Sequence, residues 1–137
     1  MNESLRTVVA TLRSSDVAMF VTARDAAPPS ARPMQIGEVE DDGTLWFVST
    51  LASSMVDALH ADPHVAVVCQ RPDAFISVSG VAEIYQFPAK LREIWRPSFD
   101  RWLPKGPETP DAVAVRVAPV SGDHWDAAGH HAHFGPT

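Results

Sequence analysis

The stretch that decides the fold is residues 31–59, which read ARPMQIGEVEDDGTLWFVSTLASSMVDAL. Alternating apolar residues predict a strand over residues 31–40 and a second strand over residues 44–50. Asp42-Gly43 lies between them and is a typical hairpin turn. The second strand leads almost directly into a short helix predicted for residues 53–61. The stretch therefore predicts an antiparallel strand pair followed at once by a helix.

Polar side chains gather around the start of this helix. Arg32 lies on the first strand, Ser49 and Thr50 end the second, and Ser53 and Ser54 open the helix. Each residue also has a simpler interpretation. Arg32 can be a surface residue of an edge strand, since a proline follows it, and the hydroxyl groups can be turn and helix-capping groups. Unpaired N–H groups at a helix start attract anions, so the combination also predicts an anion pocket.

The rest of the chain is predicted to be mainly β. We expect a helix over residues 3–13, strands at 17–23, 64–70, 74–86 and 112–118, a turn at 24–30, and a helical segment at 88–103 broken by Pro97. Most strands are joined by connections too short for parallel crossovers, and closure removes exposed edges. The prediction is a six- to seven-stranded antiparallel β-barrel with peripheral helices. We expect one domain over residues 1–127 and a flexible His-rich tail over residues 128–137.

Composition narrows the function. The chain has 137 residues and a net charge of −6, which argues against nucleic acid or an anionic membrane as the main partner. Cys69 is the single cysteine, which fits a reducing compartment. The first fifteen residues lack the apolar run of a secretory signal, and no run is long enough to span a membrane. We therefore expect a cytoplasmic protein.

Familiar chemical motifs are missing from the sequence. It has no GxGxxG, no Walker A motif, no CxxC pair, no HExxH and no GxSxG, so we nominate no catalytic residue. We assign His130, His131 and His133 to the flexible tail and predict no metal site. Trp95 and Trp102 flank Pro97, where such aromatics suit a cofactor ring, a subunit interface or local packing.

A series of short motifs resembles a known family. They are RPM at 32–34, LWFVST at 45–50, SSMVDAL at 53–59, DPHV at 62–65, SVSGVAE at 77–83, IW at 94–95, WLPKG at 102–106 and HWD at 124–126. Their order over residues 4–127 is similar to that of the general stress protein branch of the pyridoxamine 5'-phosphate oxidase-like split β-barrels. The resemblance implies a homodimer with flavin mononucleotide (FMN) bound in clefts between the subunits.

The resemblance also implies which residues would bind the cofactor. Arg32 would face the ribityl phosphate or the ring edge, Pro33 and Met34 the isoalloxazine ring, and Ser49 and Thr50 the phosphate or ring heteroatoms. Ser53 and Ser54 would hold the phosphate at the helix start. The remaining residues implied are Met55 beside the phosphate, and Trp95, Trp102 and Lys105 over the ring.

One departure from the family leaves the function open. Met55 stands where the family commonly has lysine, and losing a charge-assisted hydrogen bond would weaken phosphate binding by about 1.5–3 kcal/mol, or ten- to a hundredfold. The first hypothesis remains an FMN-binding protein whose chemistry, if any, is that of a flavin-dependent oxidoreductase. The alternatives are a barrel that has lost flavin and acts as a structural or interaction module, and a deazaflavin (F420)-dependent reductase.

Overall fold

The computed structural model describes residues 2–23 and 27–136. In chain order its elements are α1 (Glu3–Arg13), β1 (Val17–Thr22), β2 (Ser30–Val39), β3 (Leu45–Thr50), α2 (Ser54–Ala61), β4 (His64–Arg71), β5 (Ala74–Tyr85), α3 (Pro88–Ile94), the 3-10 turns η1 (Pro97–Arg101) and η2 (Gly106–Glu108), β6 (Ala112–Asp126) and β7 (His131–Phe134). The turn predicted at 24–30 falls partly on residues 24–26, which lie outside the described residues. No helix in the described part of the chain is long and apolar enough to cross a membrane.

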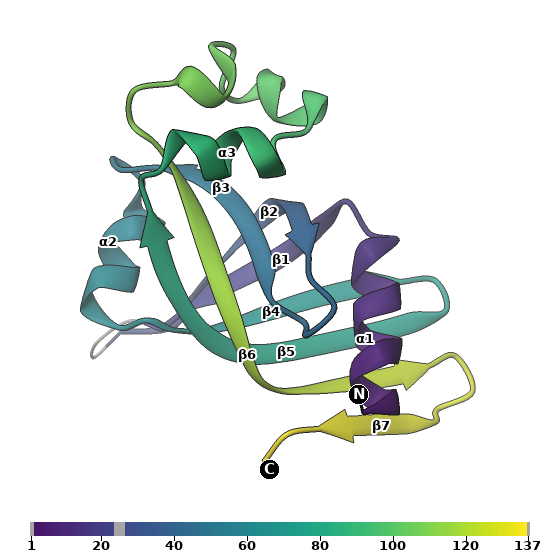
Figure 1. Ribbon diagram of the computed structural model, residues 1–137. Helices are drawn as coiled ribbons and strands as arrows, with labels where there is room; N and C mark the ends of the chain where they lie inside the picture. The colour runs from purple at the N-terminus through teal and green to yellow at the C-terminus, as the bar shows by residue number, and fades with distance from the viewer. Residues whose placement is uncertain (1, 24–26, 137) are drawn as a thin grey trace.

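The strands form one antiparallel sheet that closes on itself. Their order is β3-β2-β1-β4-β5-β6-β7, and β3 also pairs with β6. That pairing closes a six-stranded barrel and leaves β7 as an extra strand on β6 (Figure 1). The predicted fold class, an antiparallel barrel with peripheral helices, is therefore confirmed.

The barrel interior is filled by side chains that alternate along the strands. On β5, Ala74, Ile76 and Val78 point inward and are buried. Phe20 of β1 and Phe47 of β3 meet edge to face with ring centroids 5.2 Å apart, a favoured aromatic geometry. Residues buried at period two drive the strands to curl around one core.

The barrel is split between β2 and β3. These strands pair only near Ile36 to Val39, and the register shifts at a bulge between Ile36 and Glu38. Beyond the bulge β2 stays with β1, while the second half of β3, ending at Thr50, pairs with β6. Bulges redirect a strand and end a pairing, so the two strand halves diverge and leave a gap in the wall.

The segment after β5 is anchored beside this gap. Lys90 of α3 places its Nζ 3.2 Å from Glu38 Oε2 and 4.1 Å from the centroid of the Trp46 ring. Just after α3, Arg96 donates from Nε to the Gly37 carbonyl over 3.0 Å. Because both contacts hold the segment to β2 and β3, η1 begins at a fixed place above the split.

The C-terminal region differs from the prediction. β6 continues to Asp126, eight residues beyond the predicted strand end, and β7 pairs with its last part. Residues 131–134, which fall in the tail predicted over residues 128–137, form the strand β7. Phe134 is buried in the core, and a Cβ at Gly122 would overlap its ring, so a glycine makes room for this aromatic anchor. Asp126 Oδ1 accepts the His130 N–H at 2.8 Å and so caps the connecting turn.

Candidate functional site

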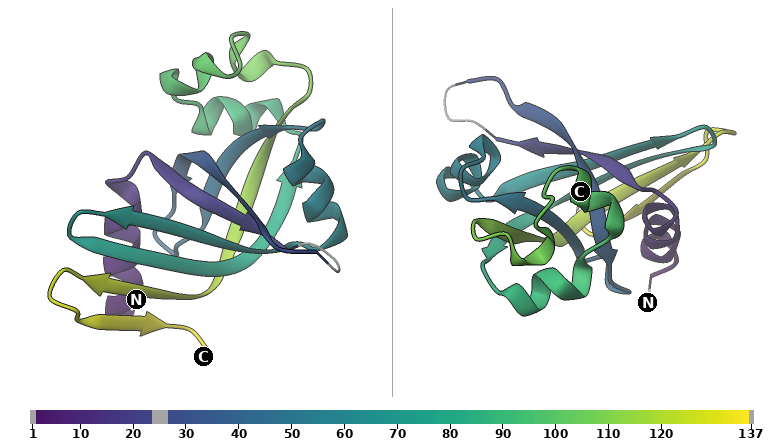
Figure 2. Two further views of the ribbon diagram at one scale, coloured as in Figure 1. Left: turned by 180° about the vertical axis from the view of Figure 1, so that it is seen from behind. Right: turned by 90° about the horizontal axis from the view of Figure 1, so that it is seen from above.

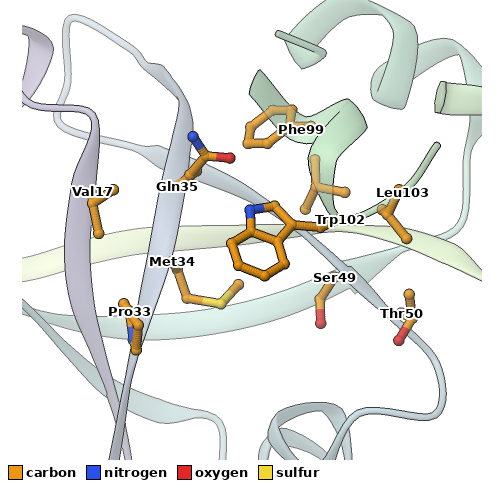
Figure 3. A pocket seen from close by; sticks show the side chains of 10 residues that line it. Val17, Pro33, Met34, Gln35, Ser49, Thr50, Phe99, Trp102 and Leu103 are labelled. Atoms are coloured by element: carbon orange, nitrogen blue, oxygen red, sulfur yellow. The ribbon is translucent and has the colours of Figure 1, made fainter. Parts of the chain in front are cut away.

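A cavity of about 460 Å³ occupies the split in the barrel. Its walls come from the diverging halves of β2 and β3, and its cover comes from η1 and the residue pair after it (Figure 3). The lining residues are Val17, Pro33, Met34, Gln35, Val48, Ser49, Thr50, Phe99, Trp102 and Leu103. The volume lies in the range of small-molecule sites, and the lining is apolar with a few polar groups, as such sites require.

Trp102 is the most exposed part of the cover. Its side chain projects into the cavity between Met34 and Ser49 (Figure 3), and the residue is 69% exposed. Phe99, which is 4% exposed, holds the base of the cover in place. A large indole left exposed over an apolar cavity is suited to stack on a flat ring.

Gln35 offers a hydrogen-bond acceptor that nothing in the described chain uses. Its Oε1 is buried and has no partner among the described residues. A buried polar atom left in this state costs about 1–3 kcal/mol. A ligand N–H donor would give the Gln35 amide a partner once this side chain turns toward the cavity, so the wall offers a polar group beside its apolar lining.

A second hollow, of about 950 Å³, lies between β2 and α2 and is lined in part by Arg32. The described residues that line it are Thr22, Ala23, Ala27, Ser30, Arg32, Ser54, Asp57, Ala58, Ala61 and Asp62. Arg32 donates from Nη2 to Ser30 Oγ over 3.0 Å, whereas its Nη1 is buried without a partner among the described residues. A guanidinium with a free N–H beside a helix start fits a phosphate or carboxylate.

Hydroxyl groups connect the two hollows. Ser49 Oγ donates to Ser53 Oγ over 3.1 Å, and Ser53 Oγ accepts the Val56 N–H over 3.2 Å as the cap of α2. Capping therefore occupies Ser53, while Thr50 lines the first hollow and Ser54 the second. Arg32 and Pro33 are consecutive on β2 and line different hollows, so the two hollows are neighbours along this strand.

The charge of the second hollow is mixed. Asp57 and Asp62 line it together with Arg32. The backbone N–H of His64, 3.0 Å from Asp62 Oδ1, and then the His64 ring at 2.8 Å lower the pKa of Asp62, so this carboxylate is charged at neutral pH. Two carboxylates reduce the attraction of this hollow for an anion.

Met55 does not offer its side chain to either hollow. The residue is 1% exposed and belongs to the main hydrophobic core. Within α2, Met55, Val56 and Leu59 are the buried positions, so this face of the helix turns toward the barrel. The resemblance implies Met55 beside the phosphate, whereas in the structure its side chain lies in the core and only its backbone N–H, in the first helical turn, lies at the helix start.

The other predicted site residues divide clearly. Pro33, Met34, Ser49, Thr50 and Trp102 line the first cavity, and Arg32 and Ser54 line the second hollow. Trp95 lines neither. Its Nε1 donates to Asp100 over 2.9 Å, and its ring packs edge to face on Phe99. Lys105 lies in a separate shallow hollow with Thr109 and Asp111.

Sequence reasoning missed Gln35, Val17 and Phe99 as lining residues. For Gln35 a signal was present, because it follows Met34 on a strand whose neighbours were already assigned to the site. Val17 is placed there by the β1–β2 register, where it lies opposite Gln35. Phe99 is brought over the cavity by the tertiary anchoring of η1, which no local pattern reveals.

A six-stranded antiparallel barrel with a covered cavity in its split defines the class of protein. The chain belongs to the family described as pyridoxamine 5'-phosphate oxidase like, whose model matches residues 3–136. The family predicted from the sequence motifs is thereby confirmed. No curated protein matches the chain.

Solved structures named as general stress proteins share this fold. A Clostridium acetobutylicum protein related to general stress protein 26 is 18% identical, covers 98% of this chain and 96% of its own, and has a TM-score of 0.83. General stress protein 26 of Bacillus anthracis is 22% identical, with 95% and 98% covered and a TM-score of 0.76. The general stress FMN/FAD binding protein of Xanthomonas citri is 20% identical, with 100% and 96% covered and a TM-score of 0.77.

Proposed function

We propose that this chain binds FMN, with the isoalloxazine ring in the split cavity and the phosphate in the hollow beside α2. The observation that carries the proposal is that two side chains with a buried polar atom that lacks a partner among the described residues, Gln35 and Arg32, each line one of the two hollows. A flavin ring presents an N–H donor on its polar edge, and the phosphate is an acceptor for guanidinium. The name of the Xanthomonas citri protein supports the same ligand class.

The chain supplies binding and orientation in this proposal. When bound, the flavin ring supplies the redox chemistry. The ten described residues that line the first cavity include no carboxylate, imidazole or amine. Trp102 and Phe99 exclude water from one face of the ring, and Gln35 sets its orientation. Any substrate would therefore react with the ring without a side-chain acid or base from this cavity.

A second copy of the chain would complete the site. β1, β4 and β5 carry outward apolar side chains, among which Val17, Met19, Val68 and Phe75 are 38–46% exposed. Met19 and Val68 are directly opposite each other in the sheet, so these side chains form a continuous face. Val17 belongs both to this face and to the first cavity. A homodimer built on this face would bury it and extend the cavity wall.

One observation favours the alternative in which flavin binding has been lost. Asp57 and Asp62 share the phosphate hollow with Arg32, and no lysine side chain enters it among the described residues. The same scarcity of cations disfavours a deazaflavin-dependent reductase. In the alternative, the barrel and its apolar face would serve as an interaction module.

The test compares FMN with riboflavin, which lacks the phosphate. Purified protein is inspected for flavin absorbance and titrated with each ligand. Arg32→Ala should weaken FMN binding by about ten- to a hundredfold and leave riboflavin binding unchanged, because only FMN offers a partner for the guanidinium. Gln35→Ala should weaken both ligands by about fivefold, since both carry the ring.

Arg6→Ala is the matched control, because Arg6 is an exposed arginine on α1 and lies outside both hollows. Equal losses for FMN and riboflavin in Arg32→Ala would show that the phosphate lies elsewhere. Absence of saturable binding of either ligand at high micromolar concentration would reject the flavin proposal and leave the interaction module.

A further inference from the structure

Asp123, His131 and His133 bring three metal-ligating atoms together on one face of the β6–β7 hairpin. In the sheet register Asp123 lies opposite His133, and Trp125 lies opposite His131. Because side chains alternate along a strand, all four side chains share one face. One ligand atom from each of Asp123, His131 and His133 lies within 4.8 Å of the others.

The hydrogen bonds of His133 indicate which of its two ring nitrogens could bind a cation in this cluster. Its Nε2 lies 2.8 Å from the Gly135 carbonyl oxygen, which can only accept, so Nε2 carries a hydrogen. In a neutral ring Nδ1 then presents a lone pair, and it points at Asp123 Oδ1 from 2.8 Å. At this distance a proton lies between the two atoms, and a metal ion would take the place of that proton.

His131 converges on the same oxygen. Its Nε2 lies 2.7 Å from Asp123 Oδ1. Its ring stacks on Trp125 with centroids 4.9 Å apart and planes 10° from parallel, which fixes the direction of the nitrogen. Metal-binding histidines are commonly oriented by such outer contacts, including a hydrogen bond from the second ring nitrogen like that of His133 to Gly135.

We propose that Asp123, His131 and His133 form a binding site for a divalent transition-metal ion of the Zn²⁺ class. Two imidazoles and one carboxylate are a suitable donor set for such ions, and three protein ligands leave a position for water. The side chains are 29%, 48% and 25% exposed, so an ion can enter from solvent. With Zn–N and Zn–O lengths of about 2.0–2.2 Å and tetrahedral angles, the ligand atoms would lie about 3.4 Å apart, so the carboxylate and the imidazoles must separate by about 0.6 Å.

The site is independent of the proposed flavin site. In Figure 1 and in the left view of Figure 2, the β6–β7 hairpin and the α3–η1 cover lie at different ends of the molecule. An ion held by Asp123 and the two histidines would link β7 to β6 across the sheet. It would thereby hold Phe134, at the end of β7, in the core.

The test uses the full chain without a histidine tag, freed of metal by a chelator and titrated with ZnCl₂ by calorimetry. We expect saturable binding of one Zn²⁺ per chain in the micromolar range. His131→Ala and Asp123→Asn should each weaken binding by at least the ten- to a hundredfold that loss of an outer-shell partner typically causes. His130→Ala is the matched control, because the ring of His130 pairs with Asp126 instead.

Two further measurements keep the result interpretable. Circular dichroism and melting of each variant establish that it is folded, and Co²⁺ added to the wild type should give the visible absorption of a nitrogen- and oxygen-ligated ion. The proposal is overturned if folded wild type shows no saturable Zn²⁺ binding. It is also overturned if His130→Ala loses as much affinity as His131→Ala.

Discussion

For the substitution Met55→Lys, the motif comparison and the structure predict opposite effects on the protein. The motif comparison predicts that a lysine restored at this position tightens FMN binding. In the structure the side chain of Met55 is 1% exposed and lies among Val56, Leu59 and the other core residues. A lysine here would meet an apolar interior before it met a phosphate, so we expect a loss of stability.

The size of the loss follows from burial and ionisation. Deprotonating a lysine of pKa about 10.4 so that it can be buried at pH 7 costs about 4.6 kcal/mol. Partial escape of the ammonium group to the surface lowers this cost, so we expect a decrease of about 3–5 kcal/mol in the free energy of unfolding. This is a large part of the 5–15 kcal/mol that typically stabilises a domain.

Urea denaturation followed by circular dichroism measures the change, with Met55→Leu as the control. Leucine keeps the volume and polarity of the site and should cost less than about 1.5 kcal/mol. FMN affinity is measured on each folded variant. A Met55→Lys variant that is as stable as the wild type and binds FMN more tightly would show that the reasoning about the start of α2 is mistaken.

Three further outcomes are expected. Phe134→Ala should lower the free energy of unfolding by about 3 kcal/mol in thermal or urea melts, because Phe134 is buried; no change would mean that β7 does not support the core. Asp42→Asn should remove a pH-dependent part of stability. The Thr44 backbone N–H, 2.9 Å from Asp42 Oδ1, lowers the pKa of Asp42 in the folded state. The Asp42 carboxylate therefore stabilises the fold above about pH 4, and this stabilisation is lost as pH falls through the folded-state pKa. The wild-type advantage over Asp42→Asn in melting temperature should thus shrink below pH 4, and a constant difference contradicts the assignment. Val68→Glu should give monomers by light scattering coupled to size-exclusion chromatography, whereas Phe87→Glu, at a 61% exposed position outside the apolar face, should not; equal behaviour of the two variants argues against this dimer face.

Local patterns were sufficient for most of the barrel. The alternation at β1, β4 and β5 reports burial on one face of each strand, and Asn2 caps α1 by accepting the Ser4 and Leu5 N–H groups. β7 escaped prediction because its sequence is rich in histidine and its burial depends on one aromatic. Phe134 packs where Gly122 has no side chain, and these residues are twelve positions apart. The hydrophobic pattern of neighbouring residues in the sequence does not reveal such a contact.

The site was predictable where it follows the strands and not where it depends on tertiary placement. Arg32, Pro33 and Met34 reach the two hollows because β2 runs between them. Met55 was assigned to the phosphate by its distance from Ser53 along the motif. The apolar spacing of Met55 and Leu59, four residues apart, already indicated one buried helix face.

The charge balance in the second hollow, between β2 and α2, bears on whether the chain binds FMN or is a barrel that has lost flavin binding. Arg32 brings to this space a guanidinium whose Nη1 has no partner among the described residues, and Asp57 and Asp62 bring two carboxylates to its border. A phosphate gains from the guanidinium and from the first N–H groups of α2, and it is repelled by both carboxylates. The split cavity carries no such conflict, because its described lining is uncharged. The ring should therefore supply most of the affinity of the proposed flavin site, and for FMN the guanidinium of Arg32 should offset the repulsion from the two carboxylates.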